Sequence, residues 1–585
     1  TDGADNNTIK NCIIVGSRTS ATSTSTTYGI VLSNSSSIST GAYSSLNTII
    51  ENNQITIALW EIYANGASSS YPNTGLSIKN NILGSSTASN NIGRTGIYAS
   101  YTSTTAGSLS AIIEGNDIRV GDVSASGAGY LANIAGIELG TVVAGTIIRK
   151  NNIHDIYQPS TAGYGAYGIN ITGSTSCNDI EISNNFITNI VACKYSTTTT
   201  QYTAFGIRYA AGATLQKILH NTIVLPAAVN GSIANYSNFG IYAVSTATFS
   251  KFLNNIIVNN NVGTGTYGFY TSATTNISGG SVDNNDYYVP NGYLGVYNGF
   301  AYSTISGWRS ATSQEANSLN IEPTFVSSTD FHLNYGTTPS QLESAGATVS
   351  STGINVDFDG QLRPGPSGSV NGGAVYPDIG ADEVDAVPLD ANPPTISYTP
   401  ISNACNVGAL TLTATITDLF GVPTSGSGLP RIYWKLNSGA WSSTQGTSIG
   451  SNQYSFTFAG TAVAGDRVSY YVVAQDNSSN VSVLPSSGAG SFTTSPPAAG
   501  TPPTSPYTFV MGGMSGTYTI GSASGSNYTR LTDAISDYNS SCLTGPVIFE
   551  LLDATYSVTA NSESFPLTIN SNSSASATNT LTIRP

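Results

Sequence analysis

Two short acidic stretches carry the side chains best suited to binding a metal ion. The first supplies Asp283, Asn285 and Asp286 within one turn, and the second supplies Asp357 and Asp359 just before a glycine. Calcium takes several carboxylate and amide oxygens as ligands. The same residue types also build tight turns without any ion. A structural calcium ion at either stretch is therefore a hypothesis, and no other cofactor is expected.

A weaker possibility of the same kind lies further along the chain, where Asp418 and Asp476 each follow a predicted strand. If the two strands belong to one sandwich, the two carboxylates could meet at one end of it.

The histidines and the remaining charged residues do not form an evident catalytic group. The chain has three histidines, His154, His220 and His332, and the first two lie 66 residues apart. Glycoside hydrolysis needs two carboxylates about 5–10 Å apart, and Asp117 and Asp155 occupy different places in the repeat described below. No catalytic residue is predicted, although a polysaccharide lyase or glycoside hydrolase stays open as an alternative. Its candidate residues would be Asp117, Asp155, Asp179, Glu181, Arg149, Lys150 and Arg208.

The elements that position these residues follow from an asparagine that recurs every 27 to 42 residues in the first half of the chain. It stands between two short apolar runs, as in the stretch 146–153 (TIIRKNNI). Equivalent asparagines stacked at one corner would tolerate a left-handed backbone bend and would bond to one another through their amides. The predicted ladder consists of Asn11, Asn53, Asn80, Asn116, Asn151, Asn185, Asn221, Asn255 and Asn285.

The repeat around this asparagine predicts a right-handed parallel β-helix. Its runs of four to six residues are rich in Ile, Val, Thr and Tyr, and a second series with Gly followed by an apolar residue keeps a fixed phase to the first. Such runs indicate strands. Each run lacks a local hairpin partner, but an equivalent run lies one period later, which is the sequence signature of a solenoid.

Changes in the repeat pattern and in proline content divide the chain into the modules of an all-β protein. A sandwich of immunoglobulin or fibronectin-III type is predicted from alternating strands separated by turns, and proline-rich stretches indicate linkers. The predicted parts are β-helix coils at 1–290, a closing segment that covers the last coil at 291–385, a linker at 386–394, the sandwich at 395–497, a proline-rich linker at 498–506, and at 507–585 the capping helix and first strands of a further β-helix.

Composition excludes two classes of partner. The 18 basic residues against 32 acidic ones give a net charge of −14, and nucleic-acid binding needs clustered basic side chains. No run of about 18 apolar residues is present, so no membrane span is expected. Five cysteines make no disulfide framework, although Cys177 and Cys193 could form one bridge or could instead be small buried side chains.

The motif Asp357-x-Asp359-Gly360-x-x-Arg363, followed by PDIGADE at 377–383, resembles the closing segment of secreted bacterial right-handed β-helix proteins. The order of modules resembles giant tandem-repeat cell-surface proteins of the type IX secretion route, including gliding-motility adhesins. This resemblance implies an extracellular, cell-surface or secreted protein of bacteria, non-enzymatic, that forms a stiff adhesive rod. Expected partners are glycans or solid surfaces, and tandem neighbours or other copies end to end, which would make a self-assembling filament.

Overall fold

The computed structural model describes residues 5–585 except 18–26, 33–43, 88–89, 92, 104–108, 122–131, 159–163, 174, 193–201, 228–236, 263–264, 272, 351–353, 372–375, 391, 402–406 and 419. It divides into two compact units, residues 1–389 and 390–585, which are treated separately below. Among the described residues, no helix is both long and apolar enough to cross a membrane.

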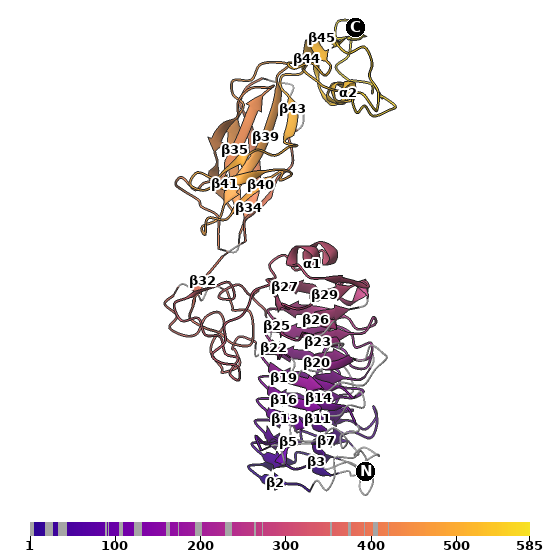
Figure 1. Ribbon diagram of the computed structural model, residues 1–585, viewed down its shortest axis with the longest axis vertical. Coiled ribbons are helices and arrows are strands. Elements are labelled where there is room, and N and C mark those ends of the chain that lie inside the picture. The colour runs from indigo at the N-terminus through magenta and orange to yellow at the C-terminus, as the bar shows by residue number, and fades with distance from the viewer. Residues whose placement is uncertain are drawn as a thin grey trace. The chain divides into compact units, whose positions relative to one another are not determined.

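The first unit is a parallel β-solenoid, as predicted, with three sheets along its length (Figure 1). The first sheet contains β1 (Thr8–Lys10), β5 (Ile49–Glu51), β9 (Ser77–Lys79), β12 (Ile112–Glu114), β15 (Ile147–Arg149), β18 (Glu181–Ser183), β21 (Gln216–Leu219), β24 (Phe249–Leu253) and β27 (Ser281–Asp283). The second sheet contains β2 (Ile13–Val15), β6 (Gln54–Thr56), β10 (Ile82–Leu83), β13 (Asp117–Gly121), β16 (Asn152–Gln158), β19 (Phe186–Ala192), β22 (Thr222–Leu225), β25 (Ile256–Asn259) and β28 (Asp286–Tyr288).

The third sheet completes each coil. It contains β3 (Tyr28–Leu32), β7 (Trp60–Asn65), β11 (Thr95–Ser100), β14 (Ile134–Leu139), β17 (Ala166–Ile171), β20 (Tyr202–Tyr209), β23 (Ser237–Ala243), β26 (Gly265–Thr271) and β29 (Tyr293–Tyr297), and the antiparallel β30 (Phe300–Tyr302) at its edge. A short pair, β4 (Ser45–Leu46) and β8 (Asn73–Thr74), lies outside these sheets. Isoleucines at equivalent positions, such as Ile113, Ile148 and Ile182, stack in the interior and are completely buried.

The glycine series marks where the third sheet comes closest to the second. A Cβ atom on Gly136 would lie 2.4 Å from Cγ2 of Ile153 and 2.8 Å from the carbonyl oxygen of Gly168. Real Cβ atoms do not approach neighbours this closely, so a side chain here would force the backbones apart.

The asparagine ladder runs along the corner between the first two sheets. Asn151 donates from its backbone N–H and from Nδ2 to Oδ1 of Asn185, both at 3.0 Å, and Nδ2 also reaches the carbonyl of Ile113 at 2.9 Å. The same bonds join Asn53, Asn81, Asn116, Asn151, Asn185, Asn221, Asn255 and Asn285.

Two predicted ladder members differ. Asn80 and Asn11 have positive φ angles, 54° and 57°, and their neighbours Asn81 and Cys12 hold the ladder position. The left-handed bend therefore falls one residue before the ladder asparagine, at Asn52, Asn80, Lys150, Asn184, His220, Asn254 and Asn284 among others. Only a side chain one residue past the bend points into the corner, where it can reach the coils on either side.

A short helix covers the last coil. Helix α1 (Ile305–Thr312) starts after Thr304, whose Oγ1 accepts the N–H of Gly307 at 3.2 Å. Trp308 on this helix is completely buried, with its ring against Phe269 and Tyr287. Strand edges and the apolar interior at this end are thereby shielded from water.

The residues that follow α1 also cover the last coil, because Glu315 and Leu319 donate backbone hydrogen bonds to the carbonyl oxygens of Val282 and Asn285. The remainder of the predicted closing segment turns back and lies beside β22 and β25 (Figure 1), and residues 313–388 are called the flank segment below. Within its described residues, the flank segment contains the short strands β31 (Pro339–Ser340) and β32 (Val387–Pro388), and the 3-10 helix η2 (Thr274–Asn276) precedes α1 in the last coil. Side chains of the left-handed corner residues also hold the flank segment.

The second unit begins with the predicted two-sheet sandwich. One sheet holds β33 (Thr395–Ser397), β34 (Leu410–Thr417), β38 (Gln453–Phe458) and β37 (Thr447–Gly450), and the other holds β36 (Ser442–Gln445), β35 (Arg431–Leu436), β39 (Arg467–Gln475), β40 (Val481–Leu484) and β43 (Tyr507–Val510). The predicted linker 498–506 instead contains β42 (Ala498–Thr501), which pairs with β41 (Gly490–Thr493). Because β43 pairs with β39, the sandwich extends to residue 510.

The last part of the second unit is a three-stranded parallel sheet. It consists of β44 (Met514–Ile520), β45 (Leu543–Leu551) and β46 (Leu581–Arg584). Helix α2 (Leu531–Ser540) buries Leu531, Ala534, Ile535 and Tyr538. Strand β44 precedes this helix and β45 and β46 follow it, and the start of a further β-helix in this part of the chain stays a prediction.

Candidate functional site

The predicted calcium ligands of the last coil do not converge. Asp283 accepts hydrogen bonds from the backbone and side chain of Asn317. Asn285 is a ladder member, and Asp286 is completely buried and accepts the N–H of Ile321. Burial raises the pKa of Asp286 to about 7, so this carboxyl is partly neutral near neutral pH.

In the closing motif, Asp357 is an internal cap. Its two oxygens accept the backbone N–H groups of Gln361 and Glu383 at 2.7 and 3.1 Å. Asp359 points elsewhere and pairs with His332. Hydrogen bonds within the flank segment therefore explain part of this motif.

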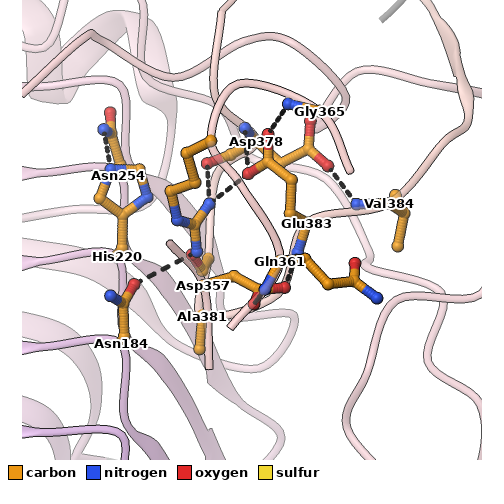
Figure 2. A network of polar contacts seen from close by, with 12 residues as sticks. Asn184, His220, Asn254, Asp357, Gln361, Gly365, Asp378, Ala381, Glu383 and Val384 are labelled. Atoms are coloured by element: carbon orange, nitrogen blue, oxygen red, sulfur yellow. Dashed lines mark hydrogen bonds and ion pairs between the residues drawn. The ribbon is translucent and has the colours of Figure 1, made fainter. Parts of the chain in front are cut away.

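This docking centres on the buried side chain of Arg363, and Figure 2 shows residues of the same network, among them Asn184, Asp378 and Glu383. Arg363 forms an ion pair with Glu383 and donates to the carbonyl oxygen of Gly380 and to Oδ1 of Asn184, which is a left-handed corner residue. Asp378 accepts the N–H of Ser344 and of Val384. Nε of Arg363 is buried without a hydrogen-bond partner among the described residues, but the other bonds of this network fix one arrangement of loops that have few strands of their own.

The predicted catalytic candidates are also held in structural contacts. His220 is buried and its Nε2 contacts Nδ2 of Asn254, and burial holds the pKa of His220 well below its usual range. The ring nitrogens of His154 lie 2.7 Å from Oδ1 of Asp117 and 2.9 Å from Oδ2 of Asp155. The two aspartates occupy different places in the repeat, so the sequence did not predict that they meet. Burial opposes protonation of His154, but the two carboxylates outweigh it and raise its pKa.

The other predicted candidates form ion pairs on the surface of the first sheet or lie in its core. Arg149 pairs with Glu114 at 3.1 Å, and Lys217 pairs with Asp179 at 2.7 Å. Cys177 is free and buried, with its thiol toward the carbonyl of Gly140. Cys193 lies outside the described residues.

In the sandwich, the structure does bring Asp418 and Asp476 together, and it adds Asp390. One carboxylate oxygen from each lies within 4.8 Å of the other two. Asp476 accepts two bonds from Asn480, and burial raises the pKa of Asp418 to about 6. These residues could hold a calcium ion, although hydrogen bonds within the cluster already satisfy part of it.

The feature that the sequence did not reveal lies on the outer surface of the third sheet. One residue from each of seven successive strands forms a column in register. This outer column consists of Tyr63, Tyr98, Glu138, Asn170, Arg208, Tyr242 and Tyr270. At about 4.8 Å between parallel strands it extends roughly 29 Å.

The outer column has aromatic ends and a polar centre. Tyr63 and Tyr98 stack with centroids 4.7 Å apart, and Tyr242 and Tyr270 stack at 5.2 Å. All four rings are half-buried. Burial, and then the neighbouring rings, raise the pKa of Tyr63 to about 12, so its phenol is neutral at physiological pH and serves as a hydrogen-bonding group.

The centre of the outer column opens into a hollow of about 380 Å³. Its charged lining residues are Arg94, Glu138 and Arg208, and its neutral polar ones include Tyr164, Asn170 and Thr172. Arg208 donates to Oδ1 of Asn170 at 3.2 Å. The hollow thus presents several donors and acceptors within a small space.

Both arginines of the hollow rest on aromatic rings. The guanidinium of Arg94 lies 4.5 Å from the centre of the Trp60 ring, and that of Arg208 lies 5.3 Å from the Tyr167 ring. Nε of Arg94 is buried without a hydrogen-bond partner among the described residues. Burial raises the pKa of Glu138 although both arginines oppose the shift.

A second hollow, of about 370 Å³, has a different character. It lies between the second sheet and the flank segment and is lined mainly by apolar groups such as Val224, Val258, Tyr288, Phe325 and Phe331. Because it offers few directed polar groups, it is the weaker candidate for specific recognition.

Comparisons with known proteins add little to this geometry. No family model matches the chain, and no curated protein matches it. A solved structure titled "The complex structure of XylC with xylose" aligns with 38% of this chain and 36% of its own, at 12% identity and a TM-score of 0.21. The aligned part is thus well under half of that protein, and likeness at this level does not bear on function.

Proposed function

We propose that the protein is a non-enzymatic extracellular rod that binds a polysaccharide chain along the outer column. The observation that carries this proposal is the register of stacked tyrosines at both ends of a polar hollow. Aromatic faces bind the apolar faces of sugar rings, and convergent polar groups bind their hydroxyls. A column of about 29 Å suits an oligosaccharide rather than a single sugar.

The charges of the hollow favour a glycan with some acidic units. Arg94 and Arg208 outnumber Glu138, and an arginine guanidinium can bind a carboxylate through two parallel hydrogen bonds. The buried Nε of Arg94 has no acceptor within the described part of the chain, and a bound ligand would supply one. A uronate-containing polysaccharide is therefore the preferred ligand class.

Affinity electrophoresis and calorimetry against neutral and uronate-containing polysaccharides would test this proposal. Arg208→Ala and Tyr98→Ala should each weaken binding, by about tenfold or more, because each removes a ring or charge from the column. Arg119→Ala is the matched control, since Arg119 is a partly exposed arginine of the second sheet. Equal losses in all three variants, or no binding by the native chain, would contradict the proposal.

The same experiment separates this function from the enzymatic alternative. Incubated polysaccharide should keep its length, as followed by size-exclusion chromatography and by reducing-end assay. Among the described residues of the outer column and its hollow, Glu138 is the single carboxylate, whereas glycoside hydrolysis uses two. Shortened polysaccharide would instead identify the chain as a lyase or hydrolase.

A further inference from the structure

Each ring nitrogen of His332 lies close to a carboxylate, but only one of the two nitrogens forms a hydrogen bond. It lies in the flank segment, with side chains of Asp330, Asp359 and Asp382 around it. Nδ1 is hydrogen-bonded to Oδ1 of Asp330. Nε2 lies 3.0 Å from Oδ2 of Asp359, yet it is buried and makes no hydrogen bond with acceptable geometry.

A third potential ligand completes the group. One ligand atom each from His332, Asp359 and Asp382 all lie within 4.8 Å of one another. Asp382 is 5% exposed, and only its Oδ2 has a hydrogen-bond partner, the N–H of Leu333. The other carboxylate oxygen of this buried residue is left without a donor in the described part of the chain.

The surroundings hold these residues in place. The ring of His332 packs edge-on against Phe186 of β19 and Phe358 of the flank segment, at 4.8 and 6.0 Å between centroids. Leu333 binds Asp382 through its backbone. Three stretches of the flank segment, near 332, 359 and 382, therefore meet at this point.

The cluster around His154 provides an internal comparison. There, both ring nitrogens form hydrogen bonds, to Asp117 and Asp155, and Arg119 lies 3.8 Å from Asp155. One imidazole and one guanidinium thus face two carboxylates. At His332, three carboxylates surround one imidazole, and Lys150 is a further cation that interacts with Asp359, so the carboxylates still outnumber the cationic side chains.

We infer that His332, Asp359 and Asp382 bind a divalent transition-metal ion such as Zn²⁺, with Asp330 as the carboxylate that orients His332. Metal-binding histidines commonly donate their other ring N–H to a carboxylate in this way. An imidazole ligand favours zinc and its neighbours over calcium or magnesium. Ligand atoms around zinc are about 3.4 Å apart, so the three side chains need only close in slightly.

The ion would act as a clasp within the flank segment. It would join three stretches that otherwise have few strands, and it would stabilise their packing on Phe186 by binding the folded form alone. This site is independent of the outer column, which lies on a different sheet, so glycan binding and metal binding can fail separately.

Titration of the untagged, chelator-treated full chain with Zn²⁺, by calorimetry, tests the inference directly. We expect about one equivalent bound at this site, and Co²⁺ in its place should give visible absorption bands. His332→Gln should abolish this binding, and Asp359→Asn, at a partly exposed position, should weaken it at least tenfold. Asp330→Asn should weaken it by about 10- to 100-fold without removing the site.

His154→Gln is the matched control and should bind Zn²⁺ as the native chain does. Circular dichroism and gel filtration would establish that each variant is folded. If His332→Gln does not fold, Asp359→Asn still tests the site. The inference is overturned if the native chain takes up no Zn²⁺, if Asp359→Asn binds it unchanged, or if the His154 variant loses it equally.

Discussion

At the scale of single residues, the asparagine ladder explains why one residue type recurs in this corner. In Asn151, the amide bonds the backbone of its own coil and of the preceding coil, and it donates to the side chain of Asn185 in the next coil. Polar backbone groups that would otherwise be buried without partners are thereby satisfied. No other side chain of this size offers both a donor and an acceptor in a fixed plane.

Asn151→Ala should lower the free energy of unfolding of the solenoid by roughly 2–4 kcal/mol. The change leaves the N–H of Asn116 without its acceptor and the carbonyl of Ile113 without one donor, and each such loss costs about 1–3 kcal/mol. Denaturant titration would measure it. Asn152→Ala is the control, because Asn152 is half-buried on the next position, and a similar loss there would contradict the explanation.

The stability of the flank segment should depend on pH through Glu343. This residue is 1% exposed, and burial raises its pKa to about 7. The folded form therefore binds the proton more tightly than the unfolded form, whose pKa is near 4.3. Stability should be greatest below about pH 4.3 as far as this group is concerned, and should fall as pH rises toward 7.

Glu343→Gln tests this dependence because it removes the titrating proton and keeps the shape. The denaturant midpoint of the first unit should differ less between pH 5 and pH 8 in this variant than in the native chain. Asp378 and Glu383 shift in the same direction through burial, so part of the dependence should remain. An unchanged difference between the two pH values would contradict the assignment to Glu343.

The residue-level pattern could be predicted only in part. The series of asparagines was visible in the sequence, and the structure places Asn53, Asn116, Asn151, Asn185, Asn221, Asn255 and Asn285 in the ladder. Asn80 and Asn81 are adjacent and fill the two different corner roles. Which of two adjacent asparagines joins the ladder depends on the backbone geometry, and the sequence pattern does not reveal that geometry.

At the scale of elements, the flank segment is a chain with little secondary structure that is fixed by side chains. Corner residues Asn184, Asn254 and Asn284 donate to the carbonyl oxygens of Val356, Ala347 and Ala345. The backbone of Gly380 donates to the carbonyl of Asn254. The left-handed bends thus serve a second purpose, because they turn these side chains outward.

Arg363→Met should release the flank segment from the solenoid. Arg363 and Glu383 are an almost completely buried ion pair, and removal of one partner from such a pair costs about 3–5 kcal/mol. Limited proteolysis should show faster cleavage between residues 313 and 388, while the strands of the third sheet stay protected. Lys217→Ala, which breaks an exposed ion pair, should leave the cleavage pattern unchanged.

Strands and sandwich were predictable because their signals are local. Alternation within six residues indicated β34, β35, β38 and β39, and the apolar spacing of α2 matched its buried face. The docking bonds from the corner asparagines to the flank segment join residues 61 to 179 positions apart. The outer column likewise depends on which residues of distant strands come into register, so short-range patterns could not reveal either one.

At the scale of the whole molecule, the first coil offers an exposed edge for association. Among the described residues, β1 and β2 each pair with a strand on one side only. Ile13 and Val15 on β2 are 78% and 62% exposed. Unpaired strands with exposed apolar side chains favour pairing with another chain.

A protein that consists of these 585 residues alone is therefore expected to associate as its concentration rises. Sedimentation velocity should show species larger than the monomer, and the double change Ile13→Lys with Val15→Lys should suppress them because charged edge residues oppose pairing. A matched change at Val262, an exposed apolar residue away from this edge, should have no effect. A native chain that stays monomeric throughout would rule out assembly through this edge.

The contacts of the flank segment have a mechanical consequence. Its bonds reach Asn184, Thr222, Asn254 and Asn284, which belong to four successive coils. Under tension, an unbraced solenoid should peel coil by coil, and each coil of 28 to 36 residues between ladder asparagines would release roughly 90 to 130 Å of chain. The braced coils should unfold together in a single longer step. The flank segment would therefore set the force at which this part of the solenoid unfolds.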